Sequence, residues 1–231
     1  MSLYRIITPP IRGDVEATIN GLQESFSPGE CCSILLIGHL TVSNVPERSI
    51  IALDPIVLSR LLAHFDHARE QRRQAAPALA GMHALPEPIT SSKDATDWLI
   101  KALAAGRDRD AGHPACALAH HLVREEAYGL VRFLLASGPG ATVAALSRRY
   151  GLSLAQFNRR CRHVLGHPLK LELRIMRAAT ALLEYSGRRR TLTHIAQDHG
   201  YASQSHFCTD IKALIGQSPL SVFRAVTPIC E

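Results

Sequence analysis

Two stretches of the chain carry side chains that can hydrogen-bond to the edges of nucleic-acid bases. Each follows a serine that suits a helix N-cap, and its polar residues lie opposite an apolar series at helical spacing. The apolar series are Phe157, Cys161 and Leu165, and Phe207, Ile211 and Ile215. Amide and guanidinium groups near the start of a helix bind base edges in the major groove. The expected base-reading residues are Ala155, Gln156, Asn158, Arg159, Gln204, Ser205, Cys208 and Thr209.

Basic side chains around these stretches are expected to bind phosphate. Each Lys or Arg that neutralises a phosphate releases condensed counterions. Residues 1–137 contain 13 Lys and Arg against 15 Asp and Glu, a net charge of −2, whereas residues 138–231 contain 13 against 5, a net charge of +8. The C-terminal part is therefore expected to bind a polyanion. The expected phosphate-binding residues are Arg148, Arg149, Arg162, Arg188, Arg189, Arg190 and Lys212.

The elements that would position these side chains form an internal repeat. Gly151 aligns with Gly200 at an offset of 49 residues, and Phe157 aligns with Phe207 at an offset of 50. Glycine at the first of these positions supplies the positive φ that ends one helix and turns the chain into the next. The sequence therefore predicts two helix-turn-helix units, at residues 142–166 and 192–216, in which Ser153 and Ser203 cap the second helices.

One long helix is predicted between the two units. After Pro168, apolar residues recur at helical spacing at Leu169, Leu173, Met176 and Leu183. A helix of about 18 residues spans roughly 27 Å. A rod of that length can set two recognition helices about one turn of DNA apart, near 34 Å, so that both enter the same face of the duplex.

Together these motifs resemble the AraC/XylS family of bacterial transcription activators. The resemblance covers about residues 120–226 and rests on RAATALL from Arg177, IAxxxGY from Ile195, SHF from Ser205 and GxSP ending at Pro219. Within the family, ELRxxR at 172–177 and HGYxSxSHFxxDIK at 199–212 look most like the regulators that switch on type III secretion genes in invasive Gram-negative bacteria. The resemblance implies sequence-specific binding to promoter DNA, RNA polymerase as a partner and no enzymatic activity.

Two residues depart from the family pattern. Thr209 stands where the family usually has Arg, and Asp210 stands where it has an apolar or neutral residue. The second unit is therefore expected to make fewer base contacts than the first.

The N-terminal part is expected to be a small α+β regulatory or partner-binding domain, residues 1–115, joined to a DNA-binding domain of residues 116–231. Residues 32–43 and 48–53 suggest strands, and residues 75–91 suggest a loop because they hold several prolines. The whole chain is then mainly α, with a C-terminal tandem helix-turn-helix domain. The N-terminal part has about half the length of the cupin barrel that sugar-sensing members of the family carry.

Two amphipathic helices of the N-terminal part form either its core or a surface for a partner or a second copy in a homodimer. The resemblance to the secretion regulators favours a partner, typically the tetratricopeptide-type chaperone of secreted translocator proteins, freed once secretion begins. A small-molecule effector bound to this domain is the alternative. The expected partner-binding residues are Leu58, Leu61, Leu62, Phe65 and Trp98.

Other functions receive little support from the sequence. No apolar run is long enough to cross a membrane, and the first residues do not have the pattern of a secretory leader, so a cytoplasmic location is expected. Six scattered cysteines without a CxxC pair suggest reduced thiols, with Cys31 and Cys32 at the head of a strand, and no metal or cofactor is expected. An enzyme that reaches DNA through the two units is disfavoured because the acidic residues of the C-terminal part are scattered.

Overall fold

The computed structural model describes residues 4–8, 14–19, 22–27, 33–70, 73, 81–85, 87–138, 140–186 and 191–221. The contacts between Cα atoms divide the chain into two compact units, Met1–Arg132 and Phe133–Glu231. Strands occur in the first unit, and the described part of the second unit is helical. The predicted fold class is confirmed.

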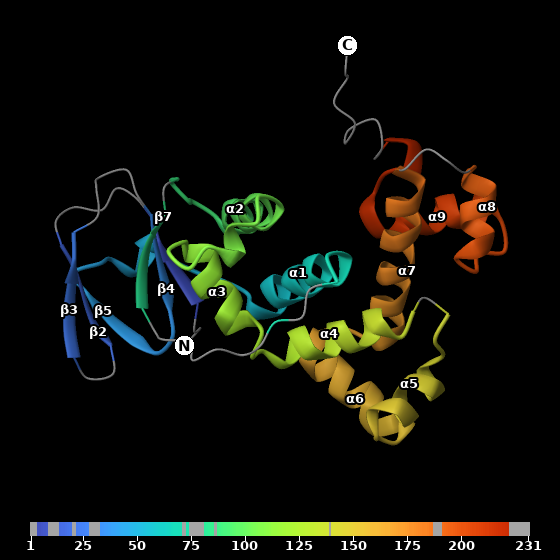
Figure 1. Ribbon diagram of the computed structural model, residues 1–231, viewed down its shortest axis with the longest axis horizontal. Coiled ribbons are helices and arrows are strands. Elements are labelled where there is room, and N and C mark those ends of the chain that lie inside the picture. Colours follow the sequence, from blue (N-terminus) through green and yellow to red (C-terminus); the bar gives the residue numbers. More distant parts are fainter. Residues whose placement is uncertain are drawn as a thin grey trace, which may run out of the picture. The chain divides into compact units, whose positions relative to one another are not determined.

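The described part of the N-terminal unit contains two antiparallel sheets (Figure 1). The first has the strand order β6-β1-β4-β7 and consists of β1 (Tyr4–Ile7), β4 (Ser33–Ile37), β6 (Ile50–Ala52) and β7 (Gly81–Leu85). The second has the order β3-β2-β5 and consists of β2 (Val15–Ile19), β3 (Leu22–Phe26) and β5 (Leu40–Ser43). All five residues of the interior strand β4 are buried, as expected for the apolar run SILLI.

Helices pack along one side of the four-stranded sheet (Figure 1). They are α1 (Pro55–Ala68), α2 (Ser92–Ala104) and α3 (Pro114–Leu122). Helix α1 begins where the sequence indicates, because the Asp54 carboxylate accepts hydrogen bonds from the first-turn amides and Pro55 takes the first helical position. Short 3₁₀ turns occupy Glu47–Ser49 and Arg107–Arg109.

The predicted loop at residues 75–91 is partly wrong, because it contains β7. This strand pairs with β4, with Leu35 opposite His83, and it lies at the edge of the sheet. Prolines flank β7 and do not occur within it, which is compatible with an edge strand. Strands β1, β2 and β3 lie before residue 32, where no strand is predicted from the sequence. Cys31 and Cys32 lie outside the described residues.

Charged groups are buried inside the N-terminal unit. Asp66 and Asp108 have fully buried carboxylates, and the Arg73 guanidinium forms ion pairs with both. The Tyr128 hydroxyl donates a hydrogen bond of 2.9 Å to Asp66. Buried carboxylates are stable only when they are paired in this way, so this network fixes the end of α1 against neighbouring segments.

Helix α4 (Glu126–Ala136) spans the boundary between the two units. Tyr128 packs in the first unit, while Phe133 belongs to the second. The sequence placed the boundary at residues 115/116, whereas the contacts divide the chain after Arg132. The difference arises because α3 packs on α1, α2 and the sheet.

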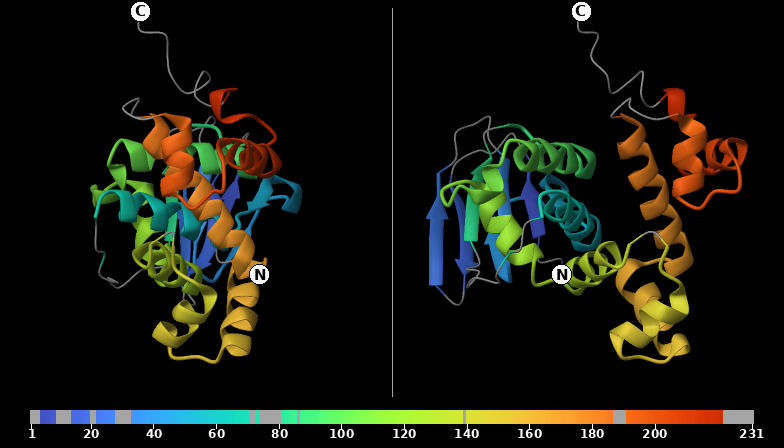
Figure 2. Two further views of the ribbon diagram at one scale, coloured as in Figure 1. Left: turned by 90° about the vertical axis from the view of Figure 1, so that its right-hand side faces the viewer. Right: turned by 45° about the vertical axis from the view of Figure 1, so that its right-hand side comes forward.

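In its described residues, the C-terminal unit continues with five helices after α4. They are α5 (Val143–Tyr150), α6 (Leu154–Leu165), α7 (Leu169–Ser186), α8 (Leu192–Asp198) and α9 (Gln204–Ile215). Helix α7 has 18 residues, as predicted for the linker helix. Helix α6 packs on α7, and α8 and α9 also pack on α7 (Figure 2).

Candidate nucleic-acid interface

The first helix-turn-helix consists of α5 and α6 and has the predicted caps. Gly151 has φ 80° and ends α5 in the left-handed conformation that favours glycine. Ser153 begins α6 with a capping box: its hydroxyl accepts from the Gln156 amide, and the Gln156 side chain accepts from the Ser153 amide. The start of α6 is therefore fixed by its own sequence.

Aromatic side chains form the core that holds α6 in place. Phe157 is fully buried, and its ring centroid lies 5.1 Å from Tyr150 of α5 and 6.4 Å from Phe133 of α4. Phe133 also packs edge-on against Tyr150 at 5.0 Å. The three rings join α4, α5 and α6 and so set the direction of the outer face of α6.

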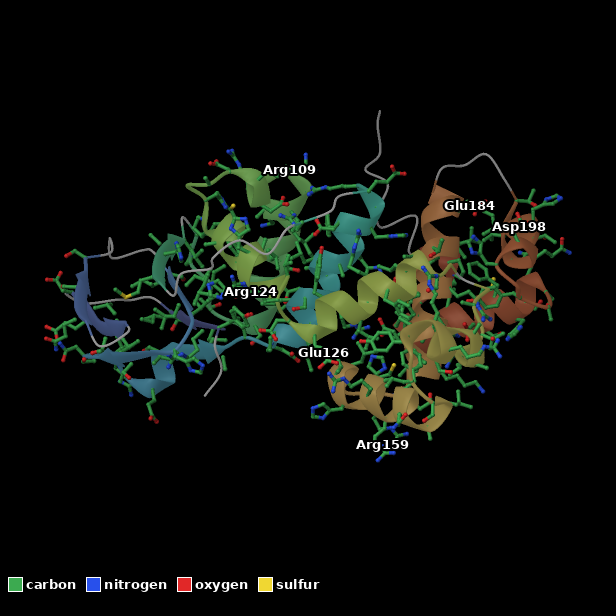
Figure 3. All side chains as sticks on the ribbon, turned by 60° about the horizontal axis from the view of Figure 1, so that its bottom comes forward. Arg109, Arg124, Glu126, Arg159, Glu184 and Asp198 are labelled. Atoms are coloured by element: carbon green, nitrogen blue, oxygen red, sulfur yellow. The ribbon has the colours of Figure 1, made fainter. Side chains whose placement is uncertain are left out.

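Arg159 lies near the centre of that outer face. Successive residues of a helix are rotated by about 100°, so Phe157, Cys161 and Val164 form the buried side, and Arg159 lies opposite them. Figure 3 shows its side chain projecting outward from α6. Ala155 lies beside it and is also exposed. This is the placement required of a base-reading arginine.

Gln156 and Asn158, the other two polar residues of α6 that are expected to contact bases, are less directly placed than Arg159. The Gln156 side-chain oxygen accepts hydrogen bonds from the Ser153 amide at 3.2 Å and the Ser153 hydroxyl at 2.8 Å. Its amide nitrogen is therefore the group that remains to face a base. Asn158 is exposed, but it lies at the flank of the outer face rather than at its centre.

The second helix-turn-helix repeats this construction. Gly200 has φ 73° at the turn, Ser203 caps α9, and Gly216 ends α9 with φ 77°. Its core is formed by buried residues of α7, α8 and α9, namely Ala178, Ala181, Leu192, Ile195, Ala196, Tyr201, Phe207 and Ile211. Ala196 of α8 and Phe207 of α9 are both fully buried, so the second unit is built around a close contact of its two helices, like the first.

The outer face of α9 is centred on Thr209, with Ser205 beside it. Cys208 is half-buried and packs against the core of the unit, so it lies at the flank of α9 rather than at the centre of the outer face. The Gln204 side-chain oxygen accepts a hydrogen bond of 2.8 Å from the Thr193 hydroxyl, which ties α9 to α8. His206, which is not among the residues expected to read bases, is exposed on α9. It corresponds to Gln156 at the offset of 50 residues that aligns Phe157 with Phe207.

Asp210, one of the two departures from the family pattern, faces the linker helix. Its carboxylate forms an ion pair with Arg174 of α7 and accepts a hydrogen bond of 3.1 Å from the Tyr201 hydroxyl. Arg177 of α7 lies over the Tyr201 ring at 5.8 Å. Burial, followed by the bond to Asp210, raises the pKa of Tyr201 above its usual value. Asp210 therefore anchors α9 to α7.

The expected phosphate-binding residues have different settings. Arg148, Arg162 and Lys212 are exposed. Arg149 is exposed but donates a hydrogen bond of 3.2 Å to the Ser137 hydroxyl and lies over the Phe133 ring, so it also holds α5 to α4. The triplet Arg188, Arg189 and Arg190 lies outside the described residues.

The expected partner surface of the N-terminal unit needs correction. Leu58, Leu62 and Trp98 are 2%, 0% and 4% exposed, because they pack in the core between α1, α2 and the rest of the unit. Their side chains are not available to a partner in this form. Leu61 and Phe65 are half-buried, and Val57, four residues before Leu61, is 43% exposed.

The described part of the chain contains no group of three or more His, Cys, Asp or Glu side chains that could hold a metal ion. None of its helices combines the length and the apolar character needed to cross a membrane.

Two helix-turn-helix units with polar outer faces, joined by one helix in a basic part of the chain, are the arrangement of a DNA-binding domain. Residues 120–225 match the family described as "Helix-turn-helix domain". The invasion protein InvF of Salmonella typhimurium is 44% identical over 99 residues, which are 42% of this chain and 46% of InvF. The transcriptional regulator MxiE of Shigella flexneri is 36% identical over 96 residues, which are 40% of this chain and 46% of MxiE.

The C-terminal part of the chain is thus an AraC-type helix-turn-helix domain homologous to those of InvF and MxiE, which confirms the resemblance inferred from its motifs. The chain matches about half the length of these relatives. Among solved structures, ToxT from Vibrio cholerae is similar with a TM-score of 0.39 and 12% sequence identity, over 99% of this chain and 92% of ToxT.

Proposed function

We propose that this protein is a sequence-specific transcriptional activator that places α6 and α9 in the major groove of promoter DNA. The observation that carries the proposal is the position of Arg159, which is exposed at the centre of the outer face of a helix fixed by three aromatic rings. A guanidinium held in this way can make paired hydrogen bonds to guanine. The net charge of +8 in residues 138–231 supplies the attraction to the backbone.

The target genes in this proposal are virulence genes of a type III secretion system. The motifs at residues 172–177 and 199–212, which resemble the secretion regulators, support this assignment. The similarity to a protein named for invasion and to a named transcriptional regulator supports it as well. Activation then takes place in the cytoplasm and involves RNA polymerase.

The regulatory input in this proposal is a secretion chaperone that docks on the N-terminal unit. Because Leu58, Leu62 and Trp98 are buried, the surface proposed for docking lies elsewhere on α1. It is the ridge of Val57, Leu61 and Phe65, which share one side of α1 at a spacing of four residues. A partner turns DNA binding into activation only if it favours the promoter-competent state, and a coupling of about 1–3 kcal/mol suffices.

The Val57→Asp variant of the full chain tests this docking. We expect the purified variant to bind promoter DNA like the wild type and to lose the response to the chaperone in a reporter strain, because a buried carboxylate disfavours an apolar contact. Ala104→Asp, which places the same charge at an exposed position of α2, is the matched control and should keep the response.

Two outcomes contradict the chaperone part of the proposal. In the first, Val57→Asp responds to the chaperone as fully as the wild type does. In the second, a small molecule raises both the melting temperature of the protein and the reporter output while the chaperone changes neither. A change from dimer to monomer in Val57→Asp would instead assign the ridge to a second copy of the chain.

A further inference from the structure

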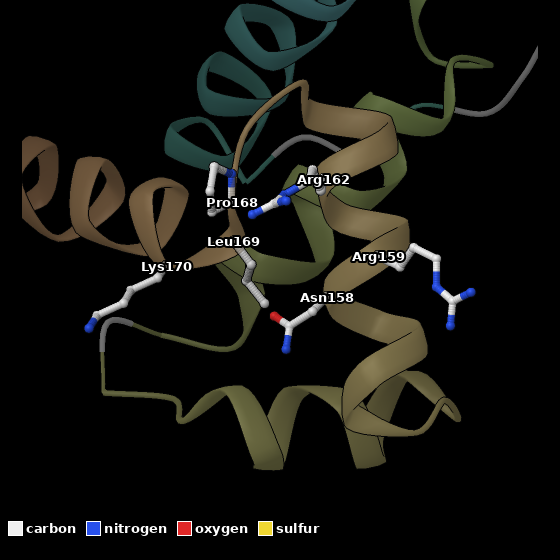
Figure 4. Close-up of a pocket in the computed structure, with 6 residues that line it drawn as sticks. All are labelled: Asn158, Arg159, Arg162, Pro168, Leu169 and Lys170. Carbon is white, nitrogen blue, oxygen red and sulfur yellow. The ribbon is translucent and has the colours of Figure 1, made fainter.

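A pocket beside the first recognition helix carries basic side chains from two different helices. It has a volume of about 310 Å³ and lies where α6 meets the beginning of α7. The residues that line it are Asn158, Arg159, Arg162, Pro168, Leu169 and Lys170. Figure 4 shows Asn158 and Arg162 on the side of α6 that faces the start of α7, while the Arg159 side chain points away from that side.

The chemistry of this pocket is that of an anion site. Arg162 and Lys170 are exposed cations, and Asn158 adds a neutral hydrogen-bond donor. The described residues that line the pocket include no carboxylate. The acidic residue of the first turn of α7, Glu172, is fully buried and faces His167 at 3.1 Å. The start of an 18-residue helix adds further positive potential.

The place of the pocket on α6 suggests which anion it takes. A helix with its side chains is about 10–12 Å wide, and the major groove is about 12 Å wide. The centre of the outer face therefore meets the bases, and the flanks of the helix meet the phosphates on either side. Asn158 and Arg162 lie on one such flank, and Lys170 extends it onto α7.

We infer that Asn158, Arg162 and Lys170 form a seat for one backbone phosphate of duplex DNA next to the bases read by Arg159. The inference rests on the proposed function and deepens it in two ways. It adds Lys170, which the sequence motifs did not mark, and it moves Asn158 from reading a base to holding the backbone. A seat built from two helices fixes the insertion of α6 relative to the linker helix, so it sets the register of the first unit on DNA.

The salt dependence of DNA binding tests the seat. The full chain binds a fluorescently labelled duplex of random sequence while the salt concentration is varied, and the slope of log affinity against log salt counts the neutralised phosphates. Loss of one phosphate contact lowers the magnitude of the slope by about 0.9. We expect Arg162→Gln and Lys170→Gln each to lower the magnitude of this slope. Because both cations bind the same phosphate, the double variant should lower it by no more than about 0.9. Lys93→Gln on α2, an exposed lysine outside the pocket, is the charge-matched control and should leave the slope unchanged.

Three results overturn the seat. An unchanged slope in the double variant assigns the two cations to solvent, and a loss of two contacts assigns them to separate phosphates. The third result would come from a second measurement, the unfolding temperature of the protein in pyrophosphate and in chloride at matched ionic strength. If pyrophosphate stabilises the wild type but not the double variant, while the DNA slope is unchanged, the pocket binds a free phosphate compound instead. A wild-type chain that shows no salt-dependent binding to duplex DNA would contradict the proposed function itself.

Discussion

Replacing Phe157 by alanine should lower the free energy of unfolding of the C-terminal unit by about 3–5 kcal/mol. The Phe157 side chain is fully buried and contacts the rings of Tyr150 and Phe133. Truncation removes the transfer free energy of the ring and leaves a cavity among three helices that other side chains cannot readily fill. Chemical denaturation followed by far-ultraviolet circular dichroism measures the change.

The chain offers two internal controls for this measurement. Leu154 lies on the same helix but is 49% exposed, so Leu154→Ala should change stability by less than about 1 kcal/mol. Trp98 is the single tryptophan of the sequence and lies in the N-terminal unit, so its fluorescence reports that unit separately. If Phe157→Ala and Leu154→Ala lowered the free energy of unfolding equally, the three rings would not form the core of the first helix-turn-helix.

Replacing Arg159 by alanine should weaken binding to the preferred DNA sequence by about 1–3 kcal/mol and relax the preference at one base position. The reason is geometric, because Arg159 is exposed at the centre of the outer face of α6, and the fixed aromatic core determines its direction. Competition binding with duplexes that carry single base changes measures both effects.

Arg148→Ala provides the comparison for Arg159. Arg148 lies in the last turn of α5, is exposed and is expected to contact phosphate. Its loss should weaken the binding of all sequences alike, since charge contacts carry no base information. If Arg159→Ala also weakened preferred and random sequences equally, Arg159 would be a phosphate contact and its base-reading role would be wrong.

The two units should contribute unequally to sequence reading. Thr209 occupies on α9 the position that Arg159 occupies on α6, at the offset of 50 residues. A threonine reaches a shorter distance and makes fewer hydrogen bonds than an arginine. Asp210 also places a negative charge on α9, and this carboxylate forms an ion pair with Arg174 instead of contacting DNA.

The helix-turn-helix units could be predicted from the sequence because their signals are local. A glycine with positive φ, a serine cap and a buried residue every fourth position are determined within about 20 residues. All three occur where predicted in both units, except that Ile215, the last residue of the second apolar series, is 48% exposed. The offset between the units could also have identified His206, because it places His206 where Gln156 lies in the first unit.

The features that the sequence did not reveal depend on contacts between distant segments. The residues of β7 have no sequence pattern typical of a strand. The strand is defined by its pairing with β4, which is far away in the sequence. The apolar residues of α1 and α2 fit either a core or a docking surface, and only packing assigns Leu58 and Trp98 to the core. The pocket with Lys170 likewise requires that the end of α6 and the start of α7 be placed side by side.

Selection of DNA sites from a random pool by the purified full chain tests the central claim most directly. If α6 and α9 are both recognition helices on one linker helix of 18 residues, the selected duplexes should contain two conserved blocks about 10–10.5 base pairs apart, centre to centre. The block read by α6 should be the more strongly conserved, and Arg159→Ala should change one position within it. A pool that shows no enrichment, or blocks whose spacing varies freely, would contradict the account.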